Sequence, residues 1–304
     1  MRILVVAVAT LAGLLLLPTD AWAFGPATHV FLGEQILNNL AYLPPVIADL
    51  LRAYPQSFLY GSMAADISLA KKYVPLGRHC HYWHVGEEIF DEAANDRQRA
   101  VALGYLSHLA ADTVAHNFFV PRQLMLTSST KALGHSYWEH RMDAHLGERF
   151  ASLARSIVMD YDHSEADALF DSVLSGTIFS FETNRRIFRG MIQVQDSDRW
   201  KAAFDRVVQH SRWDLTDDEV ELYVSHAFDS IVDYLVRRRT SLPAALDPIG
   251  EVNLHMAKRV RRMAFREGVW RQRSRLVELA DDFFPLPQMD LGYWSRRGQA
   301  QAAG

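Results

Sequence analysis

The chain lacks several features that define other classes of protein. Cys80 is the only cysteine in 304 residues, so no internal disulfide can form, and core packing or bound metal must hold the fold. Strand-like alternation of apolar and polar residues is scarce, and there are no repeats or long Ser/Gly-rich linkers. The formal net charge of −4 argues against general attraction to nucleic acid. The sequence therefore predicts an all-α fold built as one main domain.

Long apolar runs are also few, and the longest stands at the N-terminus. Ile3 to Leu17 is shorter than the ~18–20 residues that a membrane span requires, and Pro18 interrupts it. A small-x-small pattern ends at Ala23, as in secretory signals. We expect residues 1–23 to be a signal peptide, with Phe24 as the mature N-terminus and a periplasmic or extracellular destination.

Histidine, by contrast, is plentiful in the first half of the chain. The stretch from 104 to 121 reads GYLSHLAADTVAHNFFVP and carries His108, Asp112 and His116 at intervals of four residues. On an α-helix these three side chains lie near one face. Histidine and aspartate are ligands of first-row metals, so the stretch favours a metal site. The alternative is a buried polar helix with hydrogen-bonded histidines.

A second stretch repeats the pattern about 20 residues later. Residues 134–146 read GHSYWEHRMDAHL, in which His135, Glu139 and Asp143 again recur every four residues. Two such helices, packed antiparallel, would close a polynuclear metal site between them, as carboxylate–histidine bundles do.

Further candidate ligands precede these helices. His29 follows Phe24 by five residues, and a freed α-amine at Phe24 is itself a nitrogen ligand once metal displaces its proton. Asp66 ends a run of small residues. Residues 78–84, RHCHYWH, hold three histidines in six positions, with Cys80 among them. The residue pattern alone does not choose among these histidines.

Taken together, these positions resemble the zinc-dependent phospholipase C / S1–P1 nuclease family over roughly residues 24–145. That family begins with a metal-binding N-terminal residue, contains a GxxxHxxxD helix with a further histidine, and ends its ligand set with HxxxE or HxxxD. The matching positions are Phe24-Gly25, His29, Asp66, His81 followed by two aromatics, Gly104, His108, Asp112, His116, His135 and Glu139. The chain departs from the family in having Phe in place of the usual Trp and a shorter interval between Asp112 and His116.

The resemblance implies a multi-helix fold of that family and three zinc ions. The ligand sets that it implies are Asp66, His81, His108 and Asp112 for the first ion, His116, His135 and Glu139 for the second, and the amine and carbonyl of Phe24 with His29 for the third, with Asp112 as a bridge. Asp66 would also orient the attacking water, as a general base must. The implied reaction is hydrolysis of a phospholipid phosphodiester by metal-activated water.

Two other functions remain open from the sequence: a nuclease of the same metal architecture and a non-catalytic zinc-binding envelope protein. Nucleic acid is a partner only under the first of these. The His135-x-x-x-Glu139 pair favours the phospholipase branch. Lys71, Lys72 and Arg78 are near enough in sequence to clamp a phosphate, although solvated loop charges are the commoner case.

We divide the chain into a signal peptide (1–23), a metal-site region (24–150) and a helical extension packed on it (151–304). In the extension, Thr216 to Glu219 predicts a capping box at the start of a core helix. Lys258 to Arg275 has eight basic residues and one acid, together with Trp270. It predicts either the solvated face of a packed helix or a surface for peripheral membrane contact.

Overall fold

A computed structural model describes residues 24–69, 71–127, 131–174, 176–211, 213–288 and 291–297. The expected signal peptide, residues 1–23, lies outside the described residues. Every regular element in the described ranges is helical, which confirms the all-α prediction.

The α-helices are α2 (Pro26–Leu37), α3 (Pro45–Ala53), α4 (Pro55–Ala64), α5 (Trp83–Asp91), α6 (Asp96–Val114), α7 (Val120–Leu126), α8 (Lys131–Leu146), α9 (Glu148–Asp160), α10 (Ser164–Val173), α11 (Phe181–Gln195), α12 (Asp198–Gln209), α13 (Asp217–Arg237), α14 (Glu251–Arg266) and α15 (Arg273–Phe283). The short helices are η1 (Leu40–Tyr42), η2 (Lys71–Tyr73), η3 (Ala115–Phe119), η4 (Arg238–Thr240), η5 (Pro243–Ala245) and η6 (Val269–Arg271).

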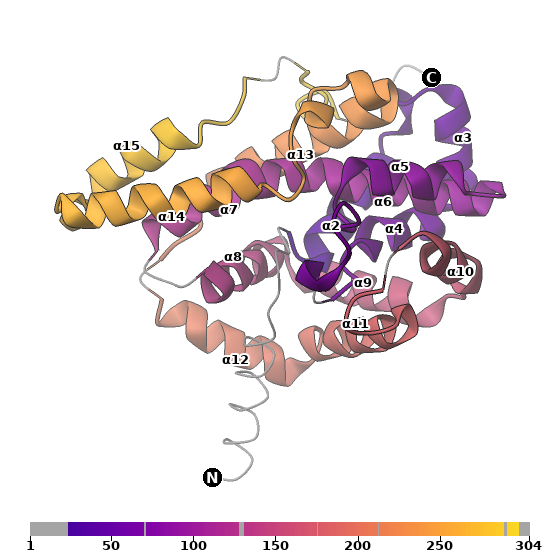
Figure 1. Cartoon of the computed structure of the whole chain (residues 1–304), viewed down its shortest axis with the longest axis horizontal. Helices are drawn as coiled ribbons and strands as arrows, with labels where there is room; N and C mark the ends of the chain where they lie inside the picture. The colour runs from indigo at the N-terminus through magenta and orange to yellow at the C-terminus, as the bar shows by residue number, and fades with distance from the viewer. Residues whose placement is uncertain are drawn as a thin grey trace, which may run out of the picture.

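Helix α6 runs through the middle of the molecule, with α13 and α4 on either side of it (Figure 1). The close approach of α4 depends on two glycines. A Cβ at Gly61 would stand 2.0 Å from the Val101 carbonyl oxygen, and one at Gly104 would stand 2.1 Å from that of Phe58. Because neither glycine has a side chain, the two backbones touch, and the end of α4 meets the histidine face of α6.

This arrangement corrects one expectation about the two histidine helices. The helices packed most extensively along α6 are α4 and α13, whereas α8 packs against α2, α7 and α9. Helix α8 reaches the candidate metal ligands at the far end of α6, where the ring centroids of His135 and His116 are 5.3 Å apart. The site is therefore assembled from more helices than the antiparallel pair that the sequence suggested.

The predicted helix over residues 104–121 is also not regular throughout. After Val114 it opens into a π-helical turn, η3, before α7 begins. Pro121 has no N–H to give to the carbonyl of residue 117 and would clash with it in an α-helix, so the wider turn relieves that conflict. The Asn117 carbonyl instead accepts a hydrogen bond of 3.1 Å from Asn253 Nδ2.

The start of α2 is held by a residue far away in the sequence. The Asp143 carboxylate of α8 accepts from the backbone N–H groups of Ala27 and Thr28 and from the Thr28 hydroxyl. A Cβ at Gly25 would lie 2.1 Å from this carboxylate, so any larger residue there would have to displace Asp143. Asp143 therefore joins α8 to α2, and it does so as a helix cap.

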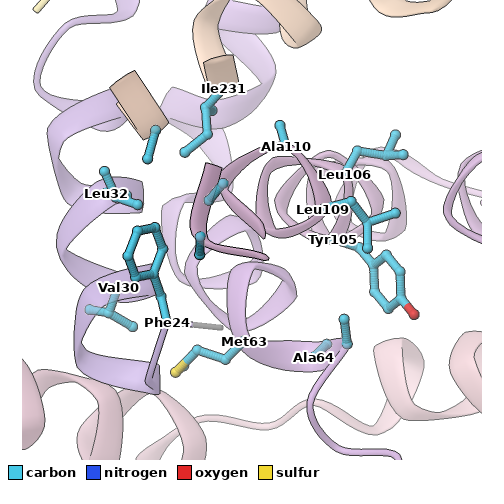
Figure 2. Close-up of a cluster of buried hydrophobic side chains, with 14 of the residues drawn as sticks. Phe24, Val30, Leu32, Met63, Ala64, Tyr105, Leu106, Leu109, Ala110 and Ile231 are labelled. Atoms are coloured by element: carbon cyan, nitrogen blue, oxygen red, sulfur yellow. The ribbon is translucent and has the colours of Figure 1, made fainter. Parts of the chain in front are cut away.

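The core surrounds the first residue that the structure describes. The ring of Phe24 is fully buried among apolar side chains of α2 and α4, including Val30, Leu32 and Met63 (Figure 2). Its ring centroid lies 5.9 Å from that of Phe119 in η3. This packing attaches the segment that precedes α2 to the turn that follows α6.

The second half of the chain packs directly on this core. Helix α13 lies against α6 and begins with the predicted capping box: Thr216 accepts from the Glu219 N–H, and the Glu219 carboxylate accepts from the Thr216 N–H. Among the described residues, no helix is both long enough and apolar enough to cross a membrane.

Candidate metal centre

The centre of the histidine cluster is the carboxylate of Asp112, on α6. Its Oδ2 lies 3.1 Å from His81 Nε2 and 3.2 Å from His108 Nε2. Its Oδ1 lies 3.4 Å from His29 Nε2. All four residues are at most 2% exposed. The two carboxylate oxygens thus face different histidines, which is the arrangement of a carboxylate that bridges two cations.

Asp66 approaches the same cluster from the end of α4. Its Oδ1 lies 3.5 Å from His81 Nε2 and 3.9 Å from His108 Nε2. The ligand atoms of His29, Asp66 and His108 all lie within 4.8 Å of one another, as do those of His81, His108 and Asp112. The structure therefore brings His29, which the resemblance assigns to one ion, close to Asp66, His81, His108 and Asp112, which it assigns to another.

Lys71 is part of this cluster, although the sequence favoured a solvated loop charge. It is 2% exposed, and its Nζ donates to Asp66 Oδ1 at 2.9 Å and lies 3.5 Å from His81 Nε2. Burial by itself would raise the pKa of Asp66, but the Lys71 ammonium and the nearby histidines hold it below its usual range. Arg78, the other candidate clamp, pairs with Glu88 and donates to the Val173 carbonyl.

A second group lies beside the first, where η3 meets α8. His116 and His135 are neighbours at 5.3 Å between ring centroids, and His135 Nε2 lies 3.3 Å from Glu139 Oε1. All three are at most 2% exposed. Burial, with the negative charges of Asp66 and Asp143, raises the pKa of Glu139 well above its usual value. A buried carboxylate of this kind ionises readily only beside a cation.

Backbone carbonyls set the orientation of two of the histidine rings. His108 Nδ1 donates to the Ser62 carbonyl at 2.9 Å, and His116 Nδ1 donates to the Pro248 carbonyl at 2.5 Å. A carbonyl oxygen only accepts, so each ring carries its proton on Nδ1 and keeps a lone pair on Nε2. Metal-binding histidines commonly have this support.

The structure separates the three histidines of residues 79–84, among which the residue pattern left the choice open and the resemblance favoured His81. His81 is fully buried and enters the cluster through Nε2, with Cys80 Sγ 3.2 Å from its Nδ1. His79 accepts the His81 backbone N–H at its Nδ1, and His84 is exposed and bonds the Gly77 carbonyl. Burial lowers the pKa of His79 to about 2. Of the three, His81 is therefore the one placed to bind a metal shared with Asp112.

The unsatisfied polar atoms of the cluster test whether a metal fits. Within the described part of the chain, no hydrogen bond reaches His29 Nε2, His116 Nε2, either oxygen of Asp112 or either oxygen of Glu139, and all are buried. Buried polar atoms are almost always satisfied, so orphans concentrated on metal-ligand atoms need another partner. Imidazole nitrogens and carboxylates form a donor set that suits zinc.

The pKa values of His29, His116 and Asp112 point the same way, whereas at His81 burial and Lys71 are outweighed by Cys80, Asp112 and Asp66, which raise its pKa above the usual value. Burial lowers the pKa of His29, and it lowers that of His116 to about 4, which keeps both rings neutral near pH 7. Burial opposes ionisation of Asp112, but the surrounding histidines hold its pKa well below the usual range. Neutral imidazoles around an ionised carboxylate are the protonation states that metal binding requires.

Fold and site together define an all-α protein with a buried histidine–carboxylate metal centre. Residues 28–183 match the family model described as zinc dependent phospholipase C. Because that match spans just over half of the chain, the protein belongs to the zinc-dependent phospholipase C family. Searches of curated proteins and of solved structures returned no match.

Sequence reasoning missed a contribution from outside the matched region. The loop between η5 and α14 covers His116: besides the Pro248 carbonyl, the Asp247 carbonyl accepts from Asn117 Nδ2 at 2.8 Å. Gly250, with φ of +62°, stands so close that a Cβ would lie 2.3 Å from the His116 carbonyl oxygen. A backbone carbonyl that accepts a hydrogen bond leaves no side-chain motif in the sequence. Gly250 was the one residue whose type could have indicated this close approach.

We expect Gly250→Ala to weaken zinc binding by about 10- to 100-fold, the usual effect of losing the partner that orients a metal-binding histidine. The added methyl must push the loop, and with it the Pro248 carbonyl, away from His116. The matched control is Gly268→Ala, because Gly268 has φ of +75° but no atom within 4 Å of its Cβ position. Zinc affinity is measured by competition with a chromophoric chelator. Equal losses in the two variants would show that the loop does not orient His116.

Proposed function

We propose that the chain is a zinc-dependent hydrolase of phosphodiesters, with a phospholipid as the substrate of a phospholipase C-type reaction. The observation that carries the proposal is the Asp112 carboxylate, whose two oxygens face His29 on one side and His81 with His108 on the other. A buried bridge of this kind suits clustered ions, and membership in the zinc-dependent phospholipase C family supplies the reaction class.

Bound zinc would supply a water of lowered pKa and positive charge for the phosphate oxygens. We assign the chain's residues as the resemblance implies. Asp66, His81, His108 and Asp112 hold one ion. His116, His135 and Glu139 hold a second. His29 and the backbone amine and carbonyl of Phe24 hold a third.

The role of Phe24 depends on export and on cleavage after Ala23, which we retain as proposals. The burial of its ring in the core is compatible with binding through backbone atoms only.

Two side chains would act directly on the reacting groups. The Asp66 carboxylate, kept ionised by Lys71, would accept a hydrogen bond from the attacking water and orient it. The Lys71 ammonium places a fixed positive charge beside His81, where it would stabilise the negative charge that builds on the phosphate. We therefore assign to Lys71 the phosphate-clamping role, which the sequence offered as the alternative to a solvated loop charge.

A cavity lies beside α8, the helix that carries His135 and Glu139. It has a volume of about 130 Å³ and extends from Asp143, one helical turn beyond Glu139, to Trp200 and Phe204 of α12. Its lining combines these aromatic rings with carboxylates. We propose that it receives part of the substrate outside the phosphodiester.

The test is a side-by-side assay of the zinc-loaded protein beginning at Phe24. The substrates are phosphatidylcholine vesicles, a chromogenic phosphocholine ester, single-stranded DNA and single-stranded RNA. We expect hydrolysis of the first two, loss of that activity with a chelator, and recovery when Zn²⁺ is restored. Apparent activity that survives the chelator would come from a contaminant.

Two results would overturn the proposal. Cleavage of nucleic acid without lipid turnover would assign the metal centre to a nuclease. Inactivity on all four substrates at full zinc occupancy would favour a non-catalytic zinc-binding protein.

A further inference from the structure

Helix α14 exposes apolar side chains on the side that faces away from the core. Leu254, Ala257, Val260 and Ala264 are buried against the rest of the molecule. On the opposite side, Val252 is 70% exposed, Met256 37% and Met263 45%. Residues 252, 256, 259, 263 and 266 recur at intervals of four and three, so they form a stripe along the helix. Arg259 and Arg266 alternate with the apolar members of that stripe.

The stripe ends in an exposed pair of aromatic rings. Gly268, with φ of +75°, ends α14 and turns the chain so that Trp270 of η6 stacks on Phe265, with 5.3 Å between ring centroids and 12° between planes. The two rings are 45% and 43% exposed. The guanidinium groups of Arg261 and Arg271 lie over them. Aromatic rings bordered by long basic side chains are typical of surfaces at the boundary of a lipid bilayer.

This turn also corrects the expectation of one continuous basic helix. Lys258 to Arg275 spans the end of α14, all of η6 and the beginning of α15. Its basic residues therefore surround the aromatic pair from two directions. Eight basic residues and one acid are concentrated here in a chain whose overall net charge is −4. Positive charge is therefore concentrated on one part of the molecule, and the same part exposes apolar side chains.

The position of the stripe links it to the metal centre. Gly250 directly precedes α14, and its Cβ position is 2.3 Å from the His116 carbonyl oxygen. Val252, the first exposed apolar residue of the stripe, lies two residues further along. A partner that contacts the start of α14 would therefore lie beside the loop between η5 and α14, which hydrogen-bonds to His116. In Figure 1, α14 and α15 (orange and yellow) extend along one side of the molecule.

We propose that the exposed surface of α14 and η6 binds anionic lipid bilayers and so brings the metal centre to its substrate. This α14–η6 surface consists of the following residues: Val252, Met256, Arg259, Arg262, Met263, Phe265, Arg266, Trp270 and Arg271. The apolar side chains enter the interface while the arginines contact lipid phosphates. The proposal rests on the proposed function, since a phospholipid substrate gives the surface its purpose.

The test is cosedimentation with vesicles of phosphatidylcholine alone and of phosphatidylcholine mixed with phosphatidylglycerol. We expect the zinc-loaded chain to prefer the anionic vesicles and to lose that preference as salt is raised. Arg262→Gln/Arg266→Gln should weaken binding by roughly 30-fold, because each surface arginine contributes about a factor of five. Phe265→Ser/Trp270→Ser should also weaken it.

The matched control is Val46→Ser/Tyr161→Ser, which replaces one aliphatic and one aromatic residue, 80% and 44% exposed, outside this surface. We expect it to bind vesicles like the unmodified chain. All variants should keep zinc content, melting temperature and hydrolysis of the soluble phosphocholine ester. That assay separates failure of the docking surface from failure of the proposed reaction.

Three outcomes would overturn the docking proposal. The first is equal binding to the two vesicle types. The second is a Phe265→Ser/Trp270→Ser variant that binds as tightly as the control. The third is sedimentation of the chain as a dimer that this variant makes monomeric, because the surface would then join two copies of the chain.

Discussion

Replacing Asp112 with asparagine is expected to lower phosphodiesterase activity by at least about 100-fold and to release bound zinc. Loss of a partner that only orients a ligand costs about 10- to 100-fold, so loss of a bridging ligand should cost more. Asparagine preserves the shape but removes the charge that faces three histidines at 3.1 to 3.4 Å. Zinc per chain and kcat/KM are the measurements.

Two variants control this experiment. His29→Ala should do less damage, because His29 serves one ion and faces only one oxygen of Asp112. Asp167→Asn replaces another buried aspartate, one that accepts from the Tyr60 hydroxyl at 2.6 Å, away from the metal centre. It should retain zinc. If Asp112→Asn and His29→Ala kept the same zinc and the same activity, Asp112 would not be a bridge.

Removal of the metal is expected to destabilise the whole protein as well as inactivate it. Without a cation, the carboxylates of Asp112 and Glu139 stay buried and unsatisfied. A ligand at 1,000 times its Kd stabilises the folded state by about 4 kcal/mol. For a protein of this size, that corresponds to a fall in melting temperature on the order of 10 °C. Differential scanning calorimetry with and without a chelator measures it.

Elemental analysis of the same sample completes this experiment. We expect more than one zinc per chain and an N-terminus at Phe24. At most one metal per chain, with an intact N-terminus and no change in melting temperature on chelation, would contradict the trinuclear arrangement. Recovery of the original melting temperature on adding Zn²⁺ would show that the chelator acted by removing metal.

Local sequence patterns were enough to predict the all-α class and the common helix face of His108 and Asp112. The spacing of His108 and Asp112 places both on one face of any helix, and the structure has them 3.2 Å apart at Nε2 and Oδ2. The capping box at Thr216 formed as predicted because its two hydrogen bonds join residues three positions apart. Such features depend on neighbours along the chain, so they follow from the residues themselves.

Only the tertiary structure decided which distant groups complete the site. The burial of Lys71 depends on where the end of α4 meets α6, which follows from the contact of Gly61 with Gly104. Of the three nearby histidines, His81 is the one that reaches Asp112, because of the direction in which its loop enters the cluster. The hydrogen bond from His116 to Pro248 spans 132 positions and ends on a backbone carbonyl. Every residue has such a carbonyl, so its identity carries no signal until the chain has folded and placed it.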